Sequence, residues 1–179
     1  MKKMKTVFVV DRTCNRATNE VMPGNEWVVN GEGVATIKHD GTSCMVRDGK
    51  LYKRFDLKAG RNMPEGFEPC EAAPDANTGH WPGWVPVNDA PENRWHNEAF
   101  ANGEFEDGTY ELVGPKVNGN KYGLTSHALW KHGCEVVEAP RTFDELRDWL
   151  ENRNIEGLVF HRGNGEMAKL RRKDFGFKW

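Results

Sequence analysis

The chain has 179 residues, of which 37% are hydrophobic and 29% are charged, so it is long enough to bury a core of ordinary size. It has no run of about 20 apolar residues, which excludes a membrane-spanning helix and any role within a membrane. The formal net charge is −2, so the overall charge gives no general attraction for nucleic acid. Near the N-terminus, the apolar stretch Val7–Val10 is too short for a signal peptide and predicts a first strand.

The cysteines are scattered along the chain and include no C-x-x-C pair. This spacing predicts neither a zinc site nor a disulfide framework and favours a reducing, cytoplasmic location. The residues concerned are Cys14, Cys44, Cys70 and Cys134. The sequence also has no internal repeat and no low-complexity segment. We therefore expect residues 1–179 to form a single domain.

The clearest local pattern is a hairpin in "TSCMVRDGKLYKRF". Two strand-like runs flank Asp48-Gly49, a pair that favours a two-residue type I′ turn. Pairing outward from this turn places Arg47 opposite Lys50 and Cys44 opposite Lys53. The hairpin would therefore hold two antiparallel strands in a defined register.

The segment from Lys58 to Asn93 is rich in proline and glycine, which predicts a long ordered loop. His80, Trp81 and Trp84 are expected to anchor this loop. Next, "PENRWHNEAFANG" predicts a short helix that ends at Gly103, and "GTYELVGPKV" predicts a strand.

The last third begins with "TFDE" at residues 142–145, which matches a capping box. Four large apolar residues follow at helical spacing: Phe143, Leu146, Trp149 and Leu150. "IEGLVFHRGNGEMAKLRR" then predicts two strands around a Gly-Asn-Gly turn. Because strands outnumber helices and tight turns join them, we expect an α+β fold of mostly antiparallel sheets with flanking helices.

Lys38 occupies an unusual position within "TIKHDGTSCMV", between β-branched and apolar residues and just before a Gly41 bend. By itself the pattern K-x-D-G is weak, since roughly a few per cent of chains of this size contain it by chance. A lone strand lysine is also more often exposed to solvent. The order of later motifs strengthens the case: "KHDG" (38–41), "LYKRF" (51–55), "YELVG" (110–114), "IEGLVF" (155–160) and "AKLRR" (168–172).

This series resembles motifs I, Ia, III, IV and V of the covalent nucleotidyltransferases, the superfamily of RNA ligases, DNA ligases and mRNA capping enzymes. "GHWPGWVPV", "YELVGPKVNGNKYG" and "KLRRKDF" further resemble a small RNA ligase 1-like group of ATP-dependent RNA ligases. Members of that group consist of little more than the nucleotidyltransferase domain. The resemblance therefore implies a single adenylyltransferase domain. With only Lys173–Trp179 after the last motif, we expect no OB-fold domain.

In this resemblance Lys38 is the catalytic nucleophile that takes AMP from ATP. A lysine amine attacks only when unprotonated, and the pKa of an ordinary lysine lies near 10.4. Burial and neighbouring cations lower such a pKa. Arg54, Lys169 and Arg171 would supply these cations and also neutralise charge on the α-phosphate. Lys169 and Arg171 are two apart in a strand and share one face. Many relatives have Lys-x-Lys here, so the Lys-x-Arg of this chain keeps the charge with a different geometry.

The two motif glutamates would have separate roles, although each taken alone is an ordinary strand carboxylate. Glu156 resembles the acid that holds a divalent metal, Mg²⁺ or Mn²⁺, beside the α-phosphate. Glu111 resembles the acid near the ribose and the lysine. Ile37, Asp40 and Gly41 complete the expected ATP-binding set, and Gly41 would permit close approach of the nucleotide or a strained backbone angle.

Aromatic and histidine residues around the third motif have weaker assignments. Tyr122 and Trp130 are both candidates for stacking on the purine, and spacing does not choose between them. His127 and His132 fit structural histidines better than nucleotide contacts. His39, between the nucleophile and Asp40, has no assigned role.

The resemblance implies an ATP-dependent RNA ligase that joins 5′-phosphate and 3′-hydroxyl RNA ends through a lysyl-AMP and an adenylylated RNA end. One alternative is an enzyme of the same fold with another acceptor, such as a DNA ligase or a protein AMP transferase. Another is a non-catalytic nucleotide- or RNA-binding module, which has no need of the nucleophile. RNA contacts are expected to be salt-sensitive. They would come from a basic patch of Lys50, Lys53, Lys116, Lys121, Arg171, Arg172 and Lys173.

Overall fold

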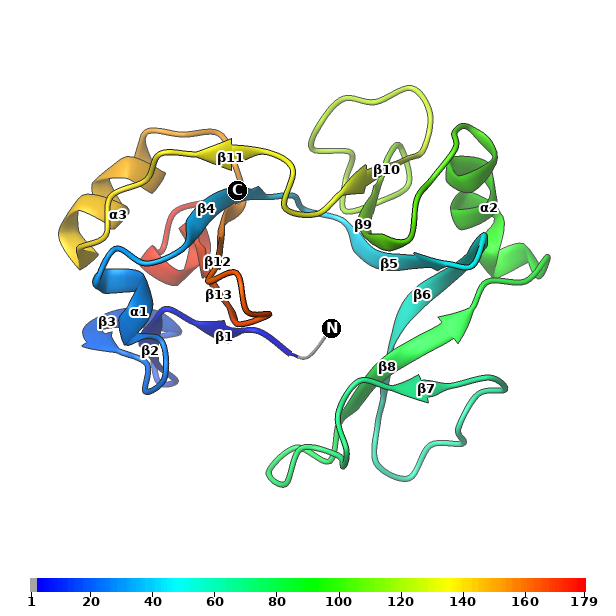
Figure 1. Cartoon of the computed structure of the whole chain (residues 1–179), viewed down its shortest axis with the longest axis horizontal. Helices are drawn as coiled ribbons and strands as arrows, with labels where there is room; N and C mark the ends of the chain where they lie inside the picture. The colour runs from blue at the N-terminus through cyan, green and yellow to red at the C-terminus, as the bar shows by residue number, and fades with distance from the viewer. Residues whose placement is uncertain (1–2) are drawn as a thin grey trace. The chain divides into compact units, whose positions relative to one another are not determined.

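The computed structural model describes residues 3–179, which divide into two compact units (Figure 1). The six-stranded unit contains residue 3 and Asp40–His132, and the five-stranded unit contains Met4–His39 and Gly133–Trp179. Each is named here after its larger sheet. The expected single domain spans residues 1–179, of which residues 1 and 2 lie outside the described part, and it stays a prediction.

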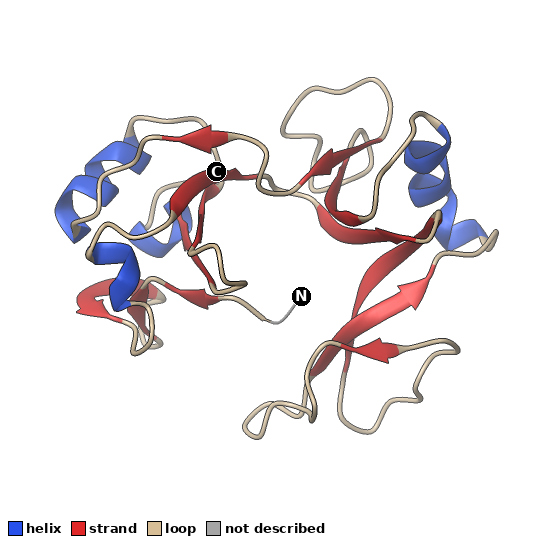
Figure 2. Ribbon diagram, in the orientation of Figure 1, coloured by secondary structure: helices blue, strands red, loops and turns tan. Residues whose placement is uncertain are grey.

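The α+β class with mostly antiparallel sheets is confirmed (Figure 2). Among the strand pairings of residues 3–179, β1 with β13 is parallel and the others are antiparallel. No helix in this described range is long and apolar enough to cross a membrane.

The five-stranded unit is built on a sheet with short outer strands. Its order is β1 (Lys5–Thr6), β13 (Met167–Arg171), β12 (Gly157–His161), β4 (Val34–Lys38) and β11 (Val136–Val137). The unit also contains the hairpin β2 (Phe8–Asp11) and β3 (Arg16–Val21), the helices α1 (Glu26–Val29) and α3 (Phe143–Glu151), and the 3₁₀ turn η2 (Arg172–Phe175). The strand predicted at Val7–Val10 corresponds to β2.

One face of this sheet packs against the two helices. Trp27 and Val28 of α1 join Leu146 and Leu150 of α3 in a buried cluster. Sheet residues of the same cluster alternate along each strand: Ala35, Leu158, Phe160, Ala168 and Leu170. Because side chains of a strand point alternately to opposite faces, the residues between them lie on the other face. We call this the polar face; it carries Thr36, Lys38, Val159, His161, Lys169 and Arg171.

The predicted helix after residue 142 is confirmed, but its capping box is wrong. Thr142 precedes α3, yet its hydroxyl donates to the Glu145 carboxylate at 2.6 Å and makes no capping bond to the backbone. A charge-assisted bond between the two side chains has replaced the reciprocal bonds to backbone N–H groups. Helix formation here depends instead on the apolar stripe, of which Leu146 and Leu150 are fully buried.

The six-stranded unit contains the predicted hairpin. Its sheet has the order β10 (Ala128–Lys131), β9 (Gly108–Val113), β5 (Thr42–Arg47), β6 (Lys50–Leu57), β8 (Trp81–Pro86) and β7 (Glu68–Pro69). Arg47 pairs with Lys50 and Cys44 with Lys53, as the sequence predicts. The 3₁₀ turn η1 (Pro91–Asn93) leads into α2 (Arg94–Ala101), which confirms the predicted short helix. Ala99 of this helix packs on Cys44 and other buried residues of the sheet.

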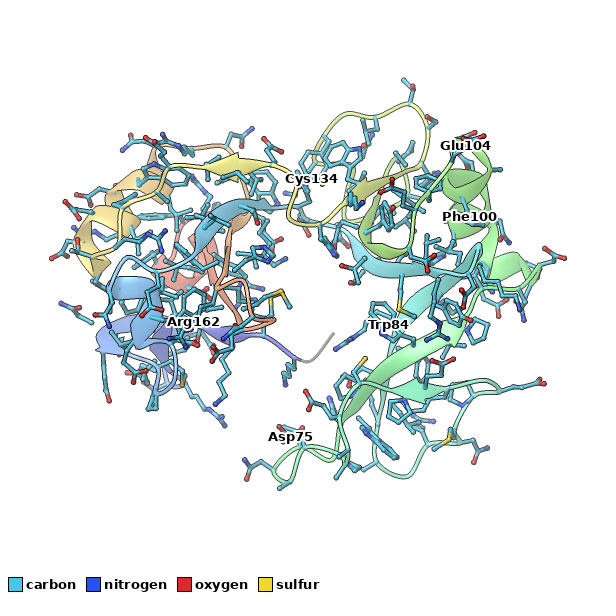
Figure 3. All side chains as sticks on the ribbon, in the orientation of Figure 1. Asp75, Trp84, Phe100, Glu104, Cys134 and Arg162 are labelled. Carbon is cyan, nitrogen blue, oxygen red and sulfur yellow. The ribbon has the colours of Figure 1, made fainter. Side chains whose placement is uncertain are left out.

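The prediction of a loop over residues 58–93 is wrong for two segments, because Glu68–Pro69 form strand β7 and Trp81–Pro86 form strand β8 between β6 and β7. Prolines in "WPGWVP" disfavour a central strand, since proline lacks the N–H that a ladder needs. Gly83 permits the pairing: a Cβ there would lie 2.5 Å from the Glu68 carbonyl oxygen of β7. Figure 3 labels Trp84 on β8, and its side chain is 4% exposed. Trp84 therefore anchors a strand rather than a loop.

Candidate functional site

Lys38, at one end of the polar face, is paired with Glu156. Lys38 ends β4, and Glu156 directly precedes β12, which pairs with β4 so that Gly157 lies opposite Lys38. This pairing brings the Lys38 Nζ to 2.6 Å from the Glu156 Oε2, with side chains 20% and 14% exposed. The lysine singled out by the sequence is thus partly buried and ion-paired. The metal-binding carboxylate predicted from the resemblance is its partner.

Lys169 lies on the same face, two strands away from β4. It pairs with Val159, which in turn pairs with Thr36. Burial, and then the positive charges of Arg171 and Lys38, lower the pKa of Lys169 from 10.5 to about 8. Burial, with a smaller contribution from neighbouring cations, therefore disfavours one charge on the polar face, and such a perturbed pKa is common at functional sites.

Arg171 is two residues from Lys169 on β13, and alternation places both on the polar face, as predicted. Gly157 lies between Arg171 and Lys38 in the sheet. A Cβ at Gly157 would come within 2.7 Å of the Arg171 Cα, so this row of the sheet tolerates no side chain there. The Arg171 guanidinium bonds to the buried carboxylate of Asp174, with Nη2 to Oδ1 at 2.7 Å. Asp174, which sequence reasoning did not single out, thus fixes this arginine.

Two further residues of the polar face were missed by sequence reasoning. The Thr36 hydroxyl is buried and lies 3.0 Å from the His161 Nε2. In the sequence, only the alternation of side chains along β4, counted back from Lys38, could have indicated that Thr36 lies on the polar face. Ile37 has the opposite orientation and packs against the hydrophobic core. Its side chain is therefore part of the core, and its predicted ATP contact would have to come from the backbone.

Glu111, the other motif glutamate, lies in the six-stranded unit on β9. Its carboxylate is nearly buried and its Oε2 is 2.7 Å from the His132 Nε2. The His132 Nδ1 is 3.0 Å from the Thr109 hydroxyl, so one imidazole connects two residues of the same strand face. The interpretation of His132 as structural overlooked this contact. It depends on the β10–β9 register, which the sequence does not reveal.

Asp40 and Gly41 begin the six-stranded unit and are held by the loop after β9. Asn118 Nδ2 donates to the Asp40 carboxylate at 2.7 Å and to the Gly41 carbonyl at 3.2 Å. The strained backbone angle suggested for Gly41 is wrong, because this glycine has no positive φ. Glycine is needed at this position for a steric reason, because a Cβ would lie 2.1 Å from the Leu112 carbonyl oxygen of β9.

The two aromatic candidates contact each other. The ring centroids of Tyr122 and Trp130 are 4.7 Å apart. The Tyr122 hydroxyl accepts a bond from the Asp40 backbone N–H at 2.6 Å. The structure thus connects Tyr122 to the motif that contains Lys38, while the choice of a stacking residue stays open.

Arg54 lies on β6 of the six-stranded unit. Its Nη1 donates to the Cys70 Sγ at 3.2 Å, and its guanidinium carbon is 5.3 Å from the centre of the Trp84 ring. These contacts hold the planar fork in place. A phosphate role for this arginine remains a prediction.

The structure places His127 in the interior of the six-stranded unit. Its ring is 2% exposed and stacks on Trp95 with centroids 4.6 Å apart. The Lys116 backbone N–H donates to its Nε2 at 3.2 Å. These contacts fit the predicted structural role.

The basic patch expected to contact RNA divides between the two units. Lys50, Lys53, Lys116 and Lys121 lie in the six-stranded unit, and Arg171, Arg172 and Lys173 lie in the five-stranded unit. Lys53 donates to the Asn93 side chain at 2.5 Å, which restrains it. A continuous patch remains a prediction.

Comparison with known proteins finds similarity to RNA ligase 1. A family model described as RNA ligase 1 matches residues 98–179. RNA ligase 1 of Rattus norvegicus is 29% identical over 222 residues, covering 82% of this chain and 68% of the relative. RNA ligase 1 of Danio rerio is 31% identical over 168 residues, covering 74% of this chain and 50% of the relative. The chain is RNA ligase 1-like.

The family match of this RNA ligase 1-like chain includes four of the predicted site residues: Glu111, Glu156, Lys169 and Arg171. Lys38 lies before the matched segment, so its assignment depends on the K-x-D-G motif and on the Glu156 contact. The curated relatives support an RNA ligase family for the chain.

A metal ion fits this site only if the protein and the substrate both coordinate it. In residues 3–179, no group of three or more His, Cys, Asp and Glu side chains gathers that could hold one. Mg²⁺, however, is commonly bound by one or two carboxylates together with substrate phosphates and water. Glu156 supplies a hard oxygen donor of that kind. The donor set of the RNA ligase 1-like chain therefore fits a substrate-assisted Mg²⁺ or Mn²⁺ site and not a protein cage.

Proposed function

We propose that the chain is an ATP-dependent RNA ligase that works through a covalent lysyl-AMP on Lys38. The observation that carries the proposal is the contact between Lys38 and Glu156 on a face crowded with cations. This arrangement has the groups that covalent transfer of a nucleotide requires: an amine nucleophile, an acidic partner and positive charge for a phosphate. The similarity to RNA ligase 1 supports the choice of ligase chemistry.

In the first step the Lys38 amine attacks the α-phosphorus of ATP. A phosphorus–nitrogen bond forms, the bond to the bridging oxygen breaks, and pyrophosphate leaves. The attacking nitrogen must lose a proton. Glu156, hydrogen-bonded to it at 2.6 Å, is positioned to accept that proton. Lys169 would supply positive charge to the phosphate oxygens as the transition state forms.

A divalent metal would be held by Glu156. When bound, such an ion neutralises charge on phosphate oxygens as a Lewis acid.

The second and third steps are proposed from the similarity to RNA ligases. The 5′-phosphate of an RNA would attack the lysyl-AMP, which releases Lys38 and forms an adenylylated end. A 3′-hydroxyl would then attack that 5′-phosphate, form the phosphodiester bond and release AMP. The predicted roles of Asp40, Arg54 and Glu111 in binding ATP are part of this proposal.

Incubation with ATP labelled at the α-phosphate and Mg²⁺ tests the first step. The wild-type chain should become labelled, and Lys38→Ala should reduce labelling by roughly 1,000-fold or more, because nothing replaces the nucleophile. Lys58→Ala, which removes an exposed lysine, is the matched control and should label normally. Equal labelling of wild type and Lys38→Ala would refute the mechanism.

A panel of acceptors tests the later steps. The labelled chain is offered 5′-phosphorylated RNA, 5′-phosphorylated DNA and a protein mixture, and transfer of the label is followed on each. Transfer to RNA, followed by sealing to a 3′-hydroxyl, is the expected result. Preference for DNA or protein would keep the lysyl-AMP chemistry and replace the proposed acceptor. GTP labelled in the same position tests the assignment of ATP.

A further inference from the structure

A pocket of about 340 Å³ opens in the five-stranded unit, beside the end of β13. It lies between the β2–β3 hairpin and the η2 turn, two segments more than 150 residues apart in the sequence. Its lining residues are Val10, Asn15, Arg16, Arg171, Lys173 and Asp174. Only Arg171 belongs to the site proposed above. The pocket is therefore a separate feature that shares one residue with the polar face.

The charge of this pocket is strongly positive. Arg16, Arg171 and Lys173 face a single carboxylate, Asp174, so the lining carries a formal charge of +2, three cations less one anion. Asp174 is 3% exposed and already accepts bonds from the guanidinium and the backbone N–H of Arg171. The internal carboxylate thus compensates Arg171 and leaves the charge of the other two cations available to a ligand.

One of the cations is held by a carboxylate, and a second lies close to a glycine. Asp174 fixes Arg171, as described above. Arg16 rests against Gly176, where a Cβ would lie 2.6 Å from the Arg16 Nε and 2.8 Å from its Cζ. Gly176 also has a φ of +91°, which favours glycine. An arginine that is already ordered, as Arg171 is, loses less conformational freedom on binding, and the planar fork of both arginines matches phosphate oxygens.

We propose that this pocket binds a phosphate group that continues from the reacting phosphate on the polar face. Arg171 links the two sites, because Gly157 alone separates it from Lys38 across the sheet. Two strand spacings put the Cα atoms of Lys38 and Arg171 about 10 Å apart. A chain of phosphates reaching from Lys38 would pass Arg171 and enter the pocket. The shared chemistry is a phosphate oxyanion, either from an RNA strand or from the pyrophosphate end of ATP.

Binding of two probes tests the pocket: a fluorescent 5′-phosphorylated single-stranded RNA, and inorganic pyrophosphate. Arg16→Ala should weaken one of them by about tenfold, the usual size for loss of one charge-assisted hydrogen bond. If RNA is the ligand, the slope of log K against log salt should also fall by about 0.7. Arg12→Ala removes another exposed arginine, which lies between Val10 and Asn15 in the sequence but does not line the pocket, and is the matched control. It should change either affinity by less than about twofold.

Gly176→Ala gives a second variant that displaces Arg16 without removing its charge, and it should reproduce the loss. Thermal unfolding shows whether the Arg16→Ala and Gly176→Ala chains fold. If either does not, Lys173→Ala takes its place in the binding measurements. Loss in the RNA arm assigns the pocket to RNA, and loss in the pyrophosphate arm assigns it to ATP. Unchanged affinity in both arms, or an equal loss in Arg12→Ala, overturns the proposal.

Whether the bound phosphate belongs to RNA or to ATP is a question that depends on the proposed ligase function. The test of whether the pocket binds phosphate does not depend on it. The binding measurements are repeated in the Lys38→Ala chain, where no covalent transfer can occur. Retained binding that still depends on Arg16 supports the pocket even if the ligase mechanism fails. Successful labelling on Lys38 without any Arg16 dependence of binding would support the ligase and refute the pocket.

Discussion

The two units arrange their charged side chains differently. On the polar face of the five-stranded unit, Lys38, Lys169 and Arg171 gather with Glu156, and burial together with like charge lowers the pKa of Lys169. In the six-stranded unit the two motif acids each have a polar side-chain partner: Glu111 contacts His132, as described above, and Asp40 contacts an asparagine. In the first arrangement burial disfavours the charge of Lys169, which a bound anion would stabilise. The second fixes orientation.

This difference predicts two kinds of mutational effect. Substitutions on the polar face should reduce the rate of transfer, and loss of Lys169 should also raise stability, because burial disfavours the charge of that lysine. Substitutions around Glu111 should act through position, with smaller effects on the rate of transfer. Three variants, in order of expected size, test the distinction.

Glu156→Gln should have the largest effect. The amide keeps the shape of the side chain but loses the negative charge that pairs with Lys38 and would hold a metal. We expect the single-turnover rate of labelling from ATP to fall about 100-fold or more, as for other loss of transition-state charge stabilisation. The thermal midpoint should change little.

Glu166→Gln is the control for this variant, because Glu166 is an exposed carboxylate in the turn between β12 and β13, paired with Arg162. It should label at the wild-type rate. If Glu156→Gln retained more than half of that rate, Glu156 would have no part in the transfer, and the ion pair would be structural.

His132→Asn should have an intermediate effect. The shorter amide cannot reach Glu111 and Thr109 together, so the carboxylate loses its fixed orientation. If Glu111 contacts the ribose, as the resemblance implies, KM for ATP should rise about tenfold with kcat nearly unchanged, the size of one lost charged hydrogen bond. His132→Gln, which is longer, should recover part of the loss.

His80→Asn is the matched control for this second variant, since His80 forms a histidine–carboxylate pair with Asp56 elsewhere in the same unit. An equal loss in kcat and in the thermal midpoint for His132→Asn, with KM unchanged, would indicate a structural role. His132 would then have no influence on nucleotide binding.

Local patterns in the sequence were sufficient for much of the fold. The Asp48-Gly49 pair predicted the hairpin and its register, and the spacing of Leu146 and Leu150 predicted α3. Strand alternation also placed Lys169 and Arg171 on one face. Each of these features is decided by residues within about one element of each other, where propensity and periodicity act.

The features that the sequence did not predict depend on contacts between distant segments. The Lys38–Glu156 pair spans 118 positions, and the motif order predicted both residues without predicting their contact. The Glu111–His132 contact depends on how β10 pairs with β9. Strand β8 forms despite its prolines because β6 and β7 pair on either side of it. Register and tertiary context override local preference in all three cases.

Lys169→Met should have the smallest effect, visible in the pH dependence of stability. The pKa of Lys169 is about 8 in the folded chain, against an ordinary value of 10.5. Between these values the unfolded chain binds more protons, so wild-type stability gains a contribution as pH rises through this window. Below pH 8 the folded chain bears the full cost of the buried charge. Methionine removes that cost, so the variant should be more stable than wild type at pH 7, by on the order of 1 kcal/mol.

Urea unfolding at pH 7 and at pH 10 measures this difference, which should shrink at the higher pH. Lys58→Met, at an exposed lysine, should show no such window. A stability difference that stays constant or grows with pH would mean that Lys169 is not crowded by charge, and the contrast between the units would weaken. The same variant should label more slowly from ATP. A gain in stability combined with a loss of transfer is what distinguishes a face arranged for an anion from one arranged for folding.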